Sequence, residues 1–448
     1  MITLTGVRVL TYAAIGLSIA WWMPRALAQD TENTGAGSSS AGSTTTTTSS
    51  TTDSSSAGGA GPNYSSGANT GGGGQLLGST NQTTGTGLFS KLPFELTITL
   101  REGYDDNPDD LSSHERGSAF TSGGIDVAYD FGDPRTRLSL SAGAGGTYYY
   151  EKIRVQDYDI DLHGGLDITH EATPRLTLRA KLYLAYLTEP NFTYAAGINQ
   201  RVGNYFFTTD QFTANYEWLP RFSTATSYTI NGLNYDNSTF GHDEDRVENT
   251  FGNEFRFLLV PTTTLVAEYR YQVITYAHVD SDSTTHYLLA GVDHTFTPRL
   301  LGSIRAGAEF RDYDRFPDRT EPYVEGTVTY ASGKRSSVIW NIRYGLEEPD
   351  FPQLQNRKTF RTGLRMKQEL TSRLTGQLSF FYEHDDNQGS DGIPSFKEDV
   401  FDVGISGRFA ITPHLGIEAG YRHTQVTSGL SSLEYYRNHV FAGLNYAF

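Results

Sequence analysis

The stretch TPRLTLRAKLYLAY (173–186) contains both signals that decide the fold. Its first four residues are typical of a turn, because proline fixes φ and has no N–H to donate to a β-ladder. In the rest of the stretch apolar and polar residues alternate, as they do in a strand whose successive side chains point to opposite faces. The sequence therefore predicts a tight turn followed by a long strand. The apolar face holds Leu176, Leu178, Ala180, Leu182, Leu184 and Tyr186, and the other face holds Thr177, Arg179, Lys181 and Tyr183.

The same turn signal recurs along the chain at intervals of roughly 35 to 46 residues. Its copies are DPRTRL (133–138), TPRL (173–176), LPRF (219–222), VPTTTL (260–265), TPRL (297–300), SGKRSS (332–337), TSRL (371–374) and TPHL (412–415). A regular period of this length is typical of repeat proteins and propellers. Two interpretations therefore compete: four short strands per period, as in a propeller blade, or two long strands.

Strand length favours the second interpretation. The alternation that follows each turn signal runs for some 12–15 residues, and FELTITLR (94–101), GIDVAYDF (124–131) and LGIEAGYR (415–422) belong to similar runs. Strands of soluble proteins are usually about 5–6 residues long, whereas a tilted strand that crosses a bilayer needs about 9–11. A propeller would also need extra turn signals within each period, and the sequence lacks them.

The connections between the predicted strands fall into two classes. The first class is the tight turns, and the second is longer and acidic. Short turns at one end and longer loops at the other are typical of bacterial outer-membrane barrels, in which the short turns are periplasmic. The longer connections are YDDNPDDLSSHERG (104–117), NYDNSTFGHDEDRVEN (234–249), HVDSDSTTH (278–286) and EHDDNQGSDGIPSF (383–396).

The fold class that follows is all-β. We expect a transmembrane antiparallel up-and-down β-barrel of about 18 strands, within a range of 16 to 20, because closure pairs every backbone group, as lipid demands. An even number puts both chain ends at the periplasmic side. The predicted strands are 92–103, 118–131, 136–150, 157–170, 175–189, 205–218, 221–234, 247–260, 263–277, 284–297, 299–313, 320–331, 335–348, 357–370, 373–386, 396–410, 414–428 and 434–448.

The N-terminal part of the chain differs from the rest. Residues 1–28 have the composition of a secretory signal peptide, with an apolar run from Val9 to Ala20 and the cleavage site Ala26-Leu27-Ala28; a retained membrane anchor is the alternative. Residues 29–87 are rich in Ser, Thr and Gly, and such a segment buries too little apolar surface to fold, so we expect it to be disordered. The barrel would then span 88–448. The chain has no cysteine, which excludes disulfides and thiolate chemistry.

The C-terminal stretch HVFAGLNYAF (439–448) ends in Phe448, with Tyr446 and Leu444 on the same face of the last predicted strand. It resembles the terminal-aromatic signal of Gram-negative outer-membrane proteins, which the barrel assembly machinery reads. Residues 88–448 resemble large porin-like barrels, and the TPRL-type turns resemble those of the β-barrel porin families. The resemblance implies a location in the outer membrane, in contact with lipid and lipopolysaccharide, but it transfers no binding residues.

Known catalytic and metal-binding motifs are missing from the sequence. It contains no P-loop, no H-E-x-x-H and no G-x-S-x-G. The acidic loops lack the Gly and distal Glu offsets of an EF-hand. We therefore expect no metal, no cofactor and no enzymatic activity. An outer-membrane hydrolase, marked by a Ser–His pair near the membrane edge, is the alternative.

Charged residues lie opposite the apolar stripe of several predicted strands, and these are the candidate lumen-lining residues. A lumen this polar is typical of a solvated channel. In the alternative interpretation, each arginine pairs with a neighbouring carboxylate and braces the wall. The candidates are Asp126, Asp130, Asp159, Asp161, Arg305, Arg343, Arg361, Arg365, Arg408 and Arg422.

These features predict an outer-membrane porin-like channel for passive diffusion of small hydrophilic solutes or ions. A barrel component of a polysaccharide or polymer export system is the alternative, and a structural or adhesive surface barrel is a third. Nothing in the sequence points to nucleic acid. The oligomeric state stays open, with a homo-oligomer among the alternatives.

Overall fold

The computed structural model describes residues 94–151, 158–188, 203–236, 241–332, 336–349, 354–390 and 394–448. All of them lie within one compact unit, Ser54–Phe448. The predicted signal peptide (1–28) and the Ser/Thr/Gly-rich segment (29–87) lie outside the described residues, and so do residues 88–93. The division of the chain into these parts therefore stays a prediction.

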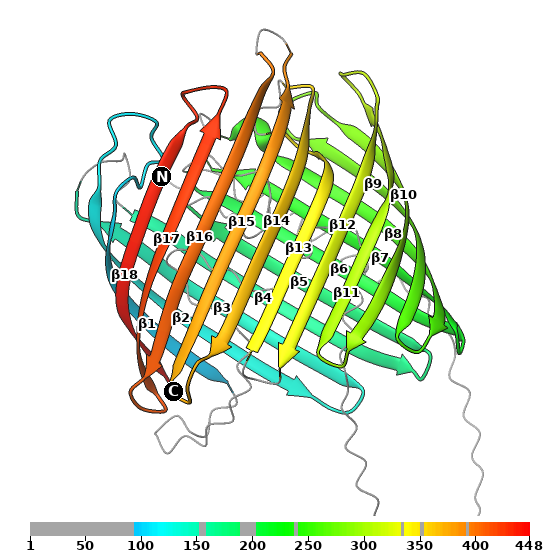
Figure 1. The fold of residues 1–448 in the computed structure, drawn as a ribbon, viewed down its shortest axis with the longest axis horizontal. Helices are drawn as coiled ribbons and strands as arrows, with labels where there is room; N and C mark the ends of the chain where they lie inside the picture. The colour runs from blue at the N-terminus through cyan, green and yellow to red at the C-terminus, as the bar shows by residue number, and fades with distance from the viewer. Residues whose placement is uncertain are drawn as a thin grey trace, which may run out of the picture. The chain divides into compact units, whose positions relative to one another are not determined.

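The described residues form one antiparallel sheet of eighteen strands, which closes on itself because β1 pairs with both β2 and β18 (Figure 1). Eighteen is the predicted number, and the ends of the predicted strands differ from the observed ones by three residues at most. The strands are β1 (Glu95–Asp105), β2 (Ser118–Gly132), β3 (Thr136–Tyr149), β4 (Tyr158–Thr173), β5 (Leu176–Leu187), β6 (Tyr205–Leu219), β7 (Phe222–Tyr235), β8 (Arg246–Val260), β9 (Thr263–Tyr276), β10 (Ser283–Thr297), β11 (Leu300–Tyr313), β12 (Arg319–Ser332), β13 (Ser336–Glu347), β14 (Asn356–Glu369), β15 (Leu374–Gln388), β16 (Phe396–Ala410), β17 (Leu415–Ser428) and β18 (Tyr435–Ala447). A short 3-10 helix, η2 (His242–Glu244), precedes β8.

Where the recurring turn signal begins with Thr or Asp, it acts through this first side chain. Thr173 Oγ1 accepts hydrogen bonds from the backbone N–H groups of Arg175 (3.2 Å) and Leu176 (3.0 Å). Thr371 and Thr412 do the same in later turns. Hydroxyl and carboxylate oxygens stabilise such turns by taking the place of a backbone acceptor. The residue between the capping side chain and these N–H donors needs no N–H of its own, so proline fits there.

Asp133 caps the first tight turn in the same way, with 2.7 Å from its Oδ1 to the backbone nitrogens of both Arg135 and Thr136. These two hydrogen bonds lower the pKa of the Asp133 carboxyl group below its ordinary value, because they favour its charged form. Thr and Asp side chains thus accept the same pair of backbone hydrogen bonds in these turns.

The strand connections define two ends of the barrel. We call the end with the tight turns the turn end and the opposite end, with the longer connections, the loop end (Figure 1). At the loop end the β1–β18 seam is joined by an ion pair between Arg437 and Asp105 (2.6 Å). At the turn end the backbone N–H of Phe448 donates to the carbonyl oxygen of Leu96 (2.9 Å). Both ends of the seam are therefore closed by contacts between the two termini of the barrel.

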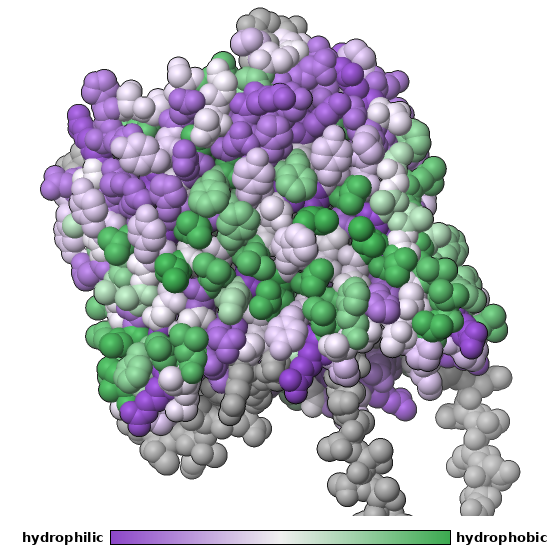
Figure 2. All heavy atoms as spheres, viewed as in Figure 1, coloured by the Kyte–Doolittle hydropathy of each residue, from purple (hydrophilic) through white to green (hydrophobic). Residues whose placement is uncertain are grey.

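One face of each strand carries large exposed apolar side chains. Examples are Leu184 on β5, Ile304 on β11 and Ile405 on β16. Figure 2 shows hydrophobic residues over the middle and lower parts of the visible face, with hydrophilic residues gathered toward the loop end. Lipid covers such a surface in an outer-membrane barrel. No helix among the described residues is long and apolar enough to cross a membrane.

Candidate functional site: the interior wall of the barrel

The polar face of the strands is the interior face, as contacts between strands that are not neighbours indicate. Arg305 on β11 lies 3.7 Å from Glu254 on β8, although β9 and β10 separate the two strands. Side chains of a closed sheet converge on the concave side and diverge on the convex side. Only interior side chains can therefore reach past neighbouring strands.

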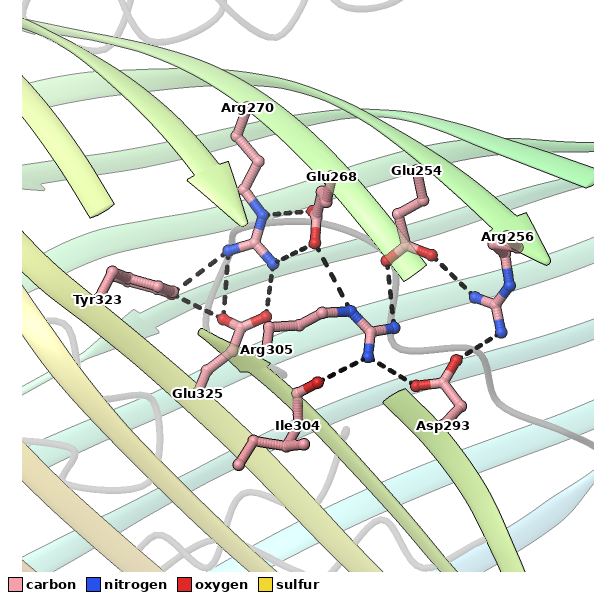
Figure 3. Close-up of polar contacts among 9 residues, drawn as sticks. All are labelled: Glu254, Arg256, Glu268, Arg270, Asp293, Ile304, Arg305, Tyr323 and Glu325. Atoms are coloured by element: carbon pink, nitrogen blue, oxygen red, sulfur yellow. Dashed lines mark hydrogen bonds and ion pairs between the residues drawn. The ribbon is translucent and has the colours of Figure 1, made fainter. Parts of the chain in front are cut away.

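Arg305 lies at the centre of an ion-pair network on this face (Figure 3). Its Nη1 lies 2.7 Å from Asp293, and its Nε lies 3.8 Å from Glu268. Arg256 bridges Glu254 (2.8 Å) and Asp293 (2.6 Å). We define the network as Glu254 and Arg256 (β8), Glu268 and Arg270 (β9), Asp293 (β10), Arg305 (β11), and Tyr323 and Glu325 (β12).

The other half of the network is centred on Arg270, whose side chain is fully buried. Its guanidinium pairs with Glu268 and with Glu325. The Tyr323 hydroxyl accepts a hydrogen bond from Arg270 Nη1 (3.3 Å) and donates one to Glu325 (2.6 Å). Each charge is thus held by several partners, as charges buried together require.

A glycine makes room for this arrangement. A Cβ atom at residue 291 would lie 2.1 Å from the carbonyl oxygen of Ile304 and 2.6 Å from Arg305 Cδ. Both distances are too short for any other residue without displacing the neighbouring strand. Gly291 therefore lets the stem of Arg305 lie flat against β10.

The composition of the network makes it sensitive to the loss of a member. It contains three arginines and four carboxylates, and most of these side chains are nearly inaccessible to solvent. Removing one partner of a buried pair costs about 3–5 kcal/mol, because the other charge stays buried without its counter-charge. The network thus stiffens the wall formed by β8 to β12.

Further ion pairs lie on the interior face of β11 and of the strands that follow the network in the sheet. Arg311 pairs with Glu348 (2.7 Å), which also accepts a hydrogen bond from the Tyr276 hydroxyl (2.6 Å). Beyond it, the interior face holds the pairs Arg343–Glu347 (3.0 Å), Arg361–Glu383 (2.8 Å) and Arg422–Asp402 (2.8 Å).

Among the predicted arginines, ion pairs are made by Arg305, Arg343, Arg361 and Arg422. Their pairing agrees with the bracing alternative. Arg365 is half-buried, and Arg408 is exposed. All six lie on the strand face opposite the exposed apolar residues.

The predicted aspartates lie on β2 and β4. His163, which the sequence did not single out, lies between two of them, with Nδ1 2.8 Å from Asp161 and Nε2 3.5 Å from Asp126. Asp159 is buried nearby on β4, whereas Asp130 is exposed and accepts a hydrogen bond from Ser139 (2.6 Å). The acids therefore do not form one cluster.

The sequence reasoning missed most of the ion-pair network. It assigned interior charge to the early and late strands and overlooked β8 and β9. A signal was available: Glu254 and Arg256, and again Glu268 and Arg270, are two residues apart, which puts each pair on one face of its strand. An acid and an arginine on the same face of two adjacent strands predict a shared network.

Burial of the interior side chains changes along the barrel axis. On β4, Asp159, Asp161 and His163 near the loop end are buried, whereas Glu171 near the turn end is exposed. On β3, Tyr149 is buried near the loop end and Arg137 is exposed near the turn end. The interior is therefore more crowded in the half toward the loop end.

A comparison with protein families gives the identity of the fold. A family model described as "Putative beta-barrel porin 2" matches residues 94–448. The chain belongs to this porin family. The porin is accordingly an outer-membrane β-barrel of the Gram-negative type, in a lipid and lipopolysaccharide environment, and a channel for small solutes. Among its described residues, no group of three or more His, Cys, Asp or Glu residues could hold a metal ion.

Solved structures offer a weaker comparison. The porin is similar to OccK2 (OpdF) of Pseudomonas aeruginosa in complex with glucuronate, with 11% identity, a TM-score of 0.44, and coverage of 79% of this chain and 98% of that one. It is similar to a BenF-like porin from Pseudomonas fluorescens Pf-5, with 11% identity, a TM-score of 0.43, and coverage of 79% and 99%. None of the curated proteins matches the porin in sequence.

Proposed function

We propose that the interior of the porin is a water-filled path for passive diffusion of small hydrophilic solutes and ions. The observation that carries the proposal is the interior wall, on which charged side chains occur around the barrel, among them on β1, β4, β9, β11, β14 and β16. Some of these charges are paired and buried against the wall, but others, such as Asp130, Glu171 and Arg408, are exposed. Lipid-facing surfaces exclude exposed charges, whereas water solvates them. We assign the lining to Asp126, Asp130, Asp159, Asp161, Arg305, Arg343, Arg361, Arg365, Arg408 and Arg422.

The path is narrowest, in this proposal, in the half toward the loop end, where interior side chains are buried. The ion-pair network of β8 to β12 lies near the middle of its strands and forms one side of the path. The other side includes Asp126 and Asp161 with His163 between them. A rigid wall of paired charges facing aspartates would hold the width of the path constant.

The charge of the porin predicts its ion preference. Without Arg8 and Arg25 of the predicted signal peptide, the 35 basic residues become 33, which against 51 acidic residues gives a net charge of −18. Much of the negative charge lies in the loops. A mouth of one sign concentrates counter-ions, and salt screens the effect as the Debye length falls to about 3 Å near 1 M.

The test is conductance of the purified full-length protein in planar bilayers under a salt gradient. We expect an open channel whose reversal potential shows a modest cation preference at low salt and a weaker one at high salt. A protein that forms heat-modifiable barrels but never conducts would contradict passive diffusion and favour the polymer-export alternative. A persistent anion preference at low salt would show that the interior arginines, and not the loops, determine the electrostatic potential along the channel.

We also propose that the porin has no enzymatic role and that the barrel assembly machinery inserts it through its C-terminal strand. Absence of hydrolysis of phospholipid by the purified barrel is the expected outcome of a direct assay. Cross-linking in intact membranes distinguishes a monomer from a homo-oligomer.

A further inference from the structure

The tight turns carry an arginine at one repeated position, directly after the proline or its equivalent. These arginines are all exposed, and they are Arg135, Arg175, Arg221, Arg299 and Arg373. The turn before β9 has Thr262 at this position, and the last turn has His414, which is half-buried. The turn at 333–335 lies outside the described residues. We call the five arginines the basic rim.

The basic rim lies where the lipid-facing surface ends, at the turn end of the barrel. Leu219 is 65% exposed and lies two residues before Arg221, and Leu370 is 61% exposed and lies three residues before Arg373. Phe296 is 60% exposed and lies three residues before Arg299. Each of these apolar side chains needs lipid, so the arginine that follows lies at the depth of the lipid headgroups. Long basic side chains favour this depth, because the stem stays in apolar surroundings and the charge in water.

The carboxylates near the rim leave most of its charge uncompensated. Asp133 lies beside Arg135 and caps its turn. Glu171, Glu217 and Glu369 lie near the turn end, but on the interior faces of β4, β6 and β14. Among the described residues, Arg175, Arg221 and Arg373 make no ion pair. The outer side of the rim therefore carries positive charge around much of the barrel.

We propose that the basic rim binds the phosphate groups of anionic phospholipids in the leaflet at the turn end of the barrel. A guanidinium group can donate two parallel hydrogen bonds to a phosphate, which makes arginine suited to this ligand. The rim is spread over separate turns and is continuous with the lipid-facing surface. A docked protein would need one contiguous patch, whereas separate lipid molecules can occupy separate turns.

The test compares two matched triple variants of the full-length porin. The rim variant combines Arg175→Gln, Arg221→Gln and Arg373→Gln. The control variant removes three exposed cations from the loop end by Arg116→Gln, Arg315→Gln and Lys397→Gln. Each protein is folded in micelles that contain equal amounts of phosphatidylglycerol and phosphatidylcholine, and native mass spectrometry counts the lipids that stay bound. Heat-modifiability on gels establishes that each variant forms a barrel.

We expect the wild type and the control variant to retain phosphatidylglycerol in several-fold excess over phosphatidylcholine, and the rim variant to lose most of this excess. Added salt should reduce the preference of the wild type, since screening weakens exposed charge pairs. Equal retention by the rim variant and the wild type, or an equal loss in the control variant, would overturn the proposal. Should the rim variant fail to fold, a wild-type preference that is absent or insensitive to salt would overturn it.

Two further arms separate the source of the phosphate and the class of partner. Inorganic phosphate at the same concentration should leave the bound phosphatidylglycerol unchanged; if it displaces the lipid fully, the rim is a site for soluble anions instead. Co-sedimentation with purified peptidoglycan should be the same for wild type and rim variant. A loss of co-sedimentation in a rim variant that keeps its lipid preference would assign the rim to the cell wall.

Discussion

Arg305 on β11 and Glu254 on β8 interact at 3.7 Å across two intervening strands, so the interior wall is held by contacts that the β-ladder alone does not provide. Both side chains are 2% exposed. The pairing shows that at least this part of the polar interior has a mechanical role. In the proposed channel, the residues that line the path would therefore also determine the rigidity of the barrel.

Replacing Arg305 by alanine should lower the free energy of unfolding by about 3–5 kcal/mol, because Glu254 and Asp293 then lose a buried partner. Urea titration in vesicles measures the loss, with the exposed Trp218 and Trp340 as fluorescent reporters of the bilayer. Arg408→Ala is the matched control, since Arg408 is an exposed arginine on the same face; its effect should stay within about 0.5 kcal/mol. Equal effects would mean that the network adds no stability.

Cysteines at Ser112 or Ser390, in the longer loops, should react on intact cells with an impermeant maleimide. Cysteines at Thr173 or Thr297, in the tight turns, should react only after the outer membrane is opened. The chain contains no native cysteine, so no background labelling interferes. The reverse pattern of labelling would place the turn end at the cell surface.

Deleting Phe448 should leave the porin secreted but poorly inserted. The deletion removes the hydrogen bond from the Phe448 amide to Leu96 and the contact of the Phe448 ring with Tyr446, whose ring centroid lies 4.7 Å away. Membrane fractionation with heat-modifiability measures insertion. Phe448→Tyr, which keeps an aromatic ring, is the control and should insert normally. Normal insertion of the deletion variant would show that the terminal residue carries no assembly signal.

Neutralising Asp126, Asp130, Asp159 and Asp161 together, each to Asn, should reduce the cation preference of the channel. Replacing Arg361 and Arg365 by Gln should increase it, because carboxylates such as Glu383 then lose a counter-charge. Reversal potentials at low salt measure both shifts. An unchanged potential in both variants would mean that the loops alone determine the preference.

The Asp133 turn should loosen in acid. Because the folded state lowers the pKa of Asp133, its contribution to stability is present above the pKa of the unfolded chain and is lost as pH falls through the lower folded value. Hydrogen exchange at the Arg135 and Thr136 amides should speed up over that interval, relative to the rate expected from pH alone. The Thr173 turn is the internal control, since its hydroxyl cap does not titrate in this range. Parallel behaviour of both turns would contradict the role of Asp133.

The architecture could be predicted from the sequence because two repeating patterns are present together: the alternation of apolar and polar residues, and the regularly spaced turn signal. Alternation with period two determines the strands, and the Thr-Pro-Arg-Leu signal at residues such as 173–176 marks every second connection. The candidate site was harder to predict. A contact such as Arg270 with Glu325 joins strands that are not adjacent, and it depends on the curvature and stagger of the closed barrel, which no local pattern contains. The position of His163 between two aspartates is a second example of this limit.

The seam between β1 and β18 has a consequence for biogenesis. Asp105 and Arg437, which join it, are 332 residues apart in the chain. Pairing over such a separation pays the entropy of closing a very long loop, so it is intrinsically slow and comes after local hairpins have formed. Until the last strand is made, β1 and β17 are open edges that can pair with other chains. A prematurely terminated chain can never close, so it should aggregate or be degraded, and only complete translation products should accumulate as functional channels.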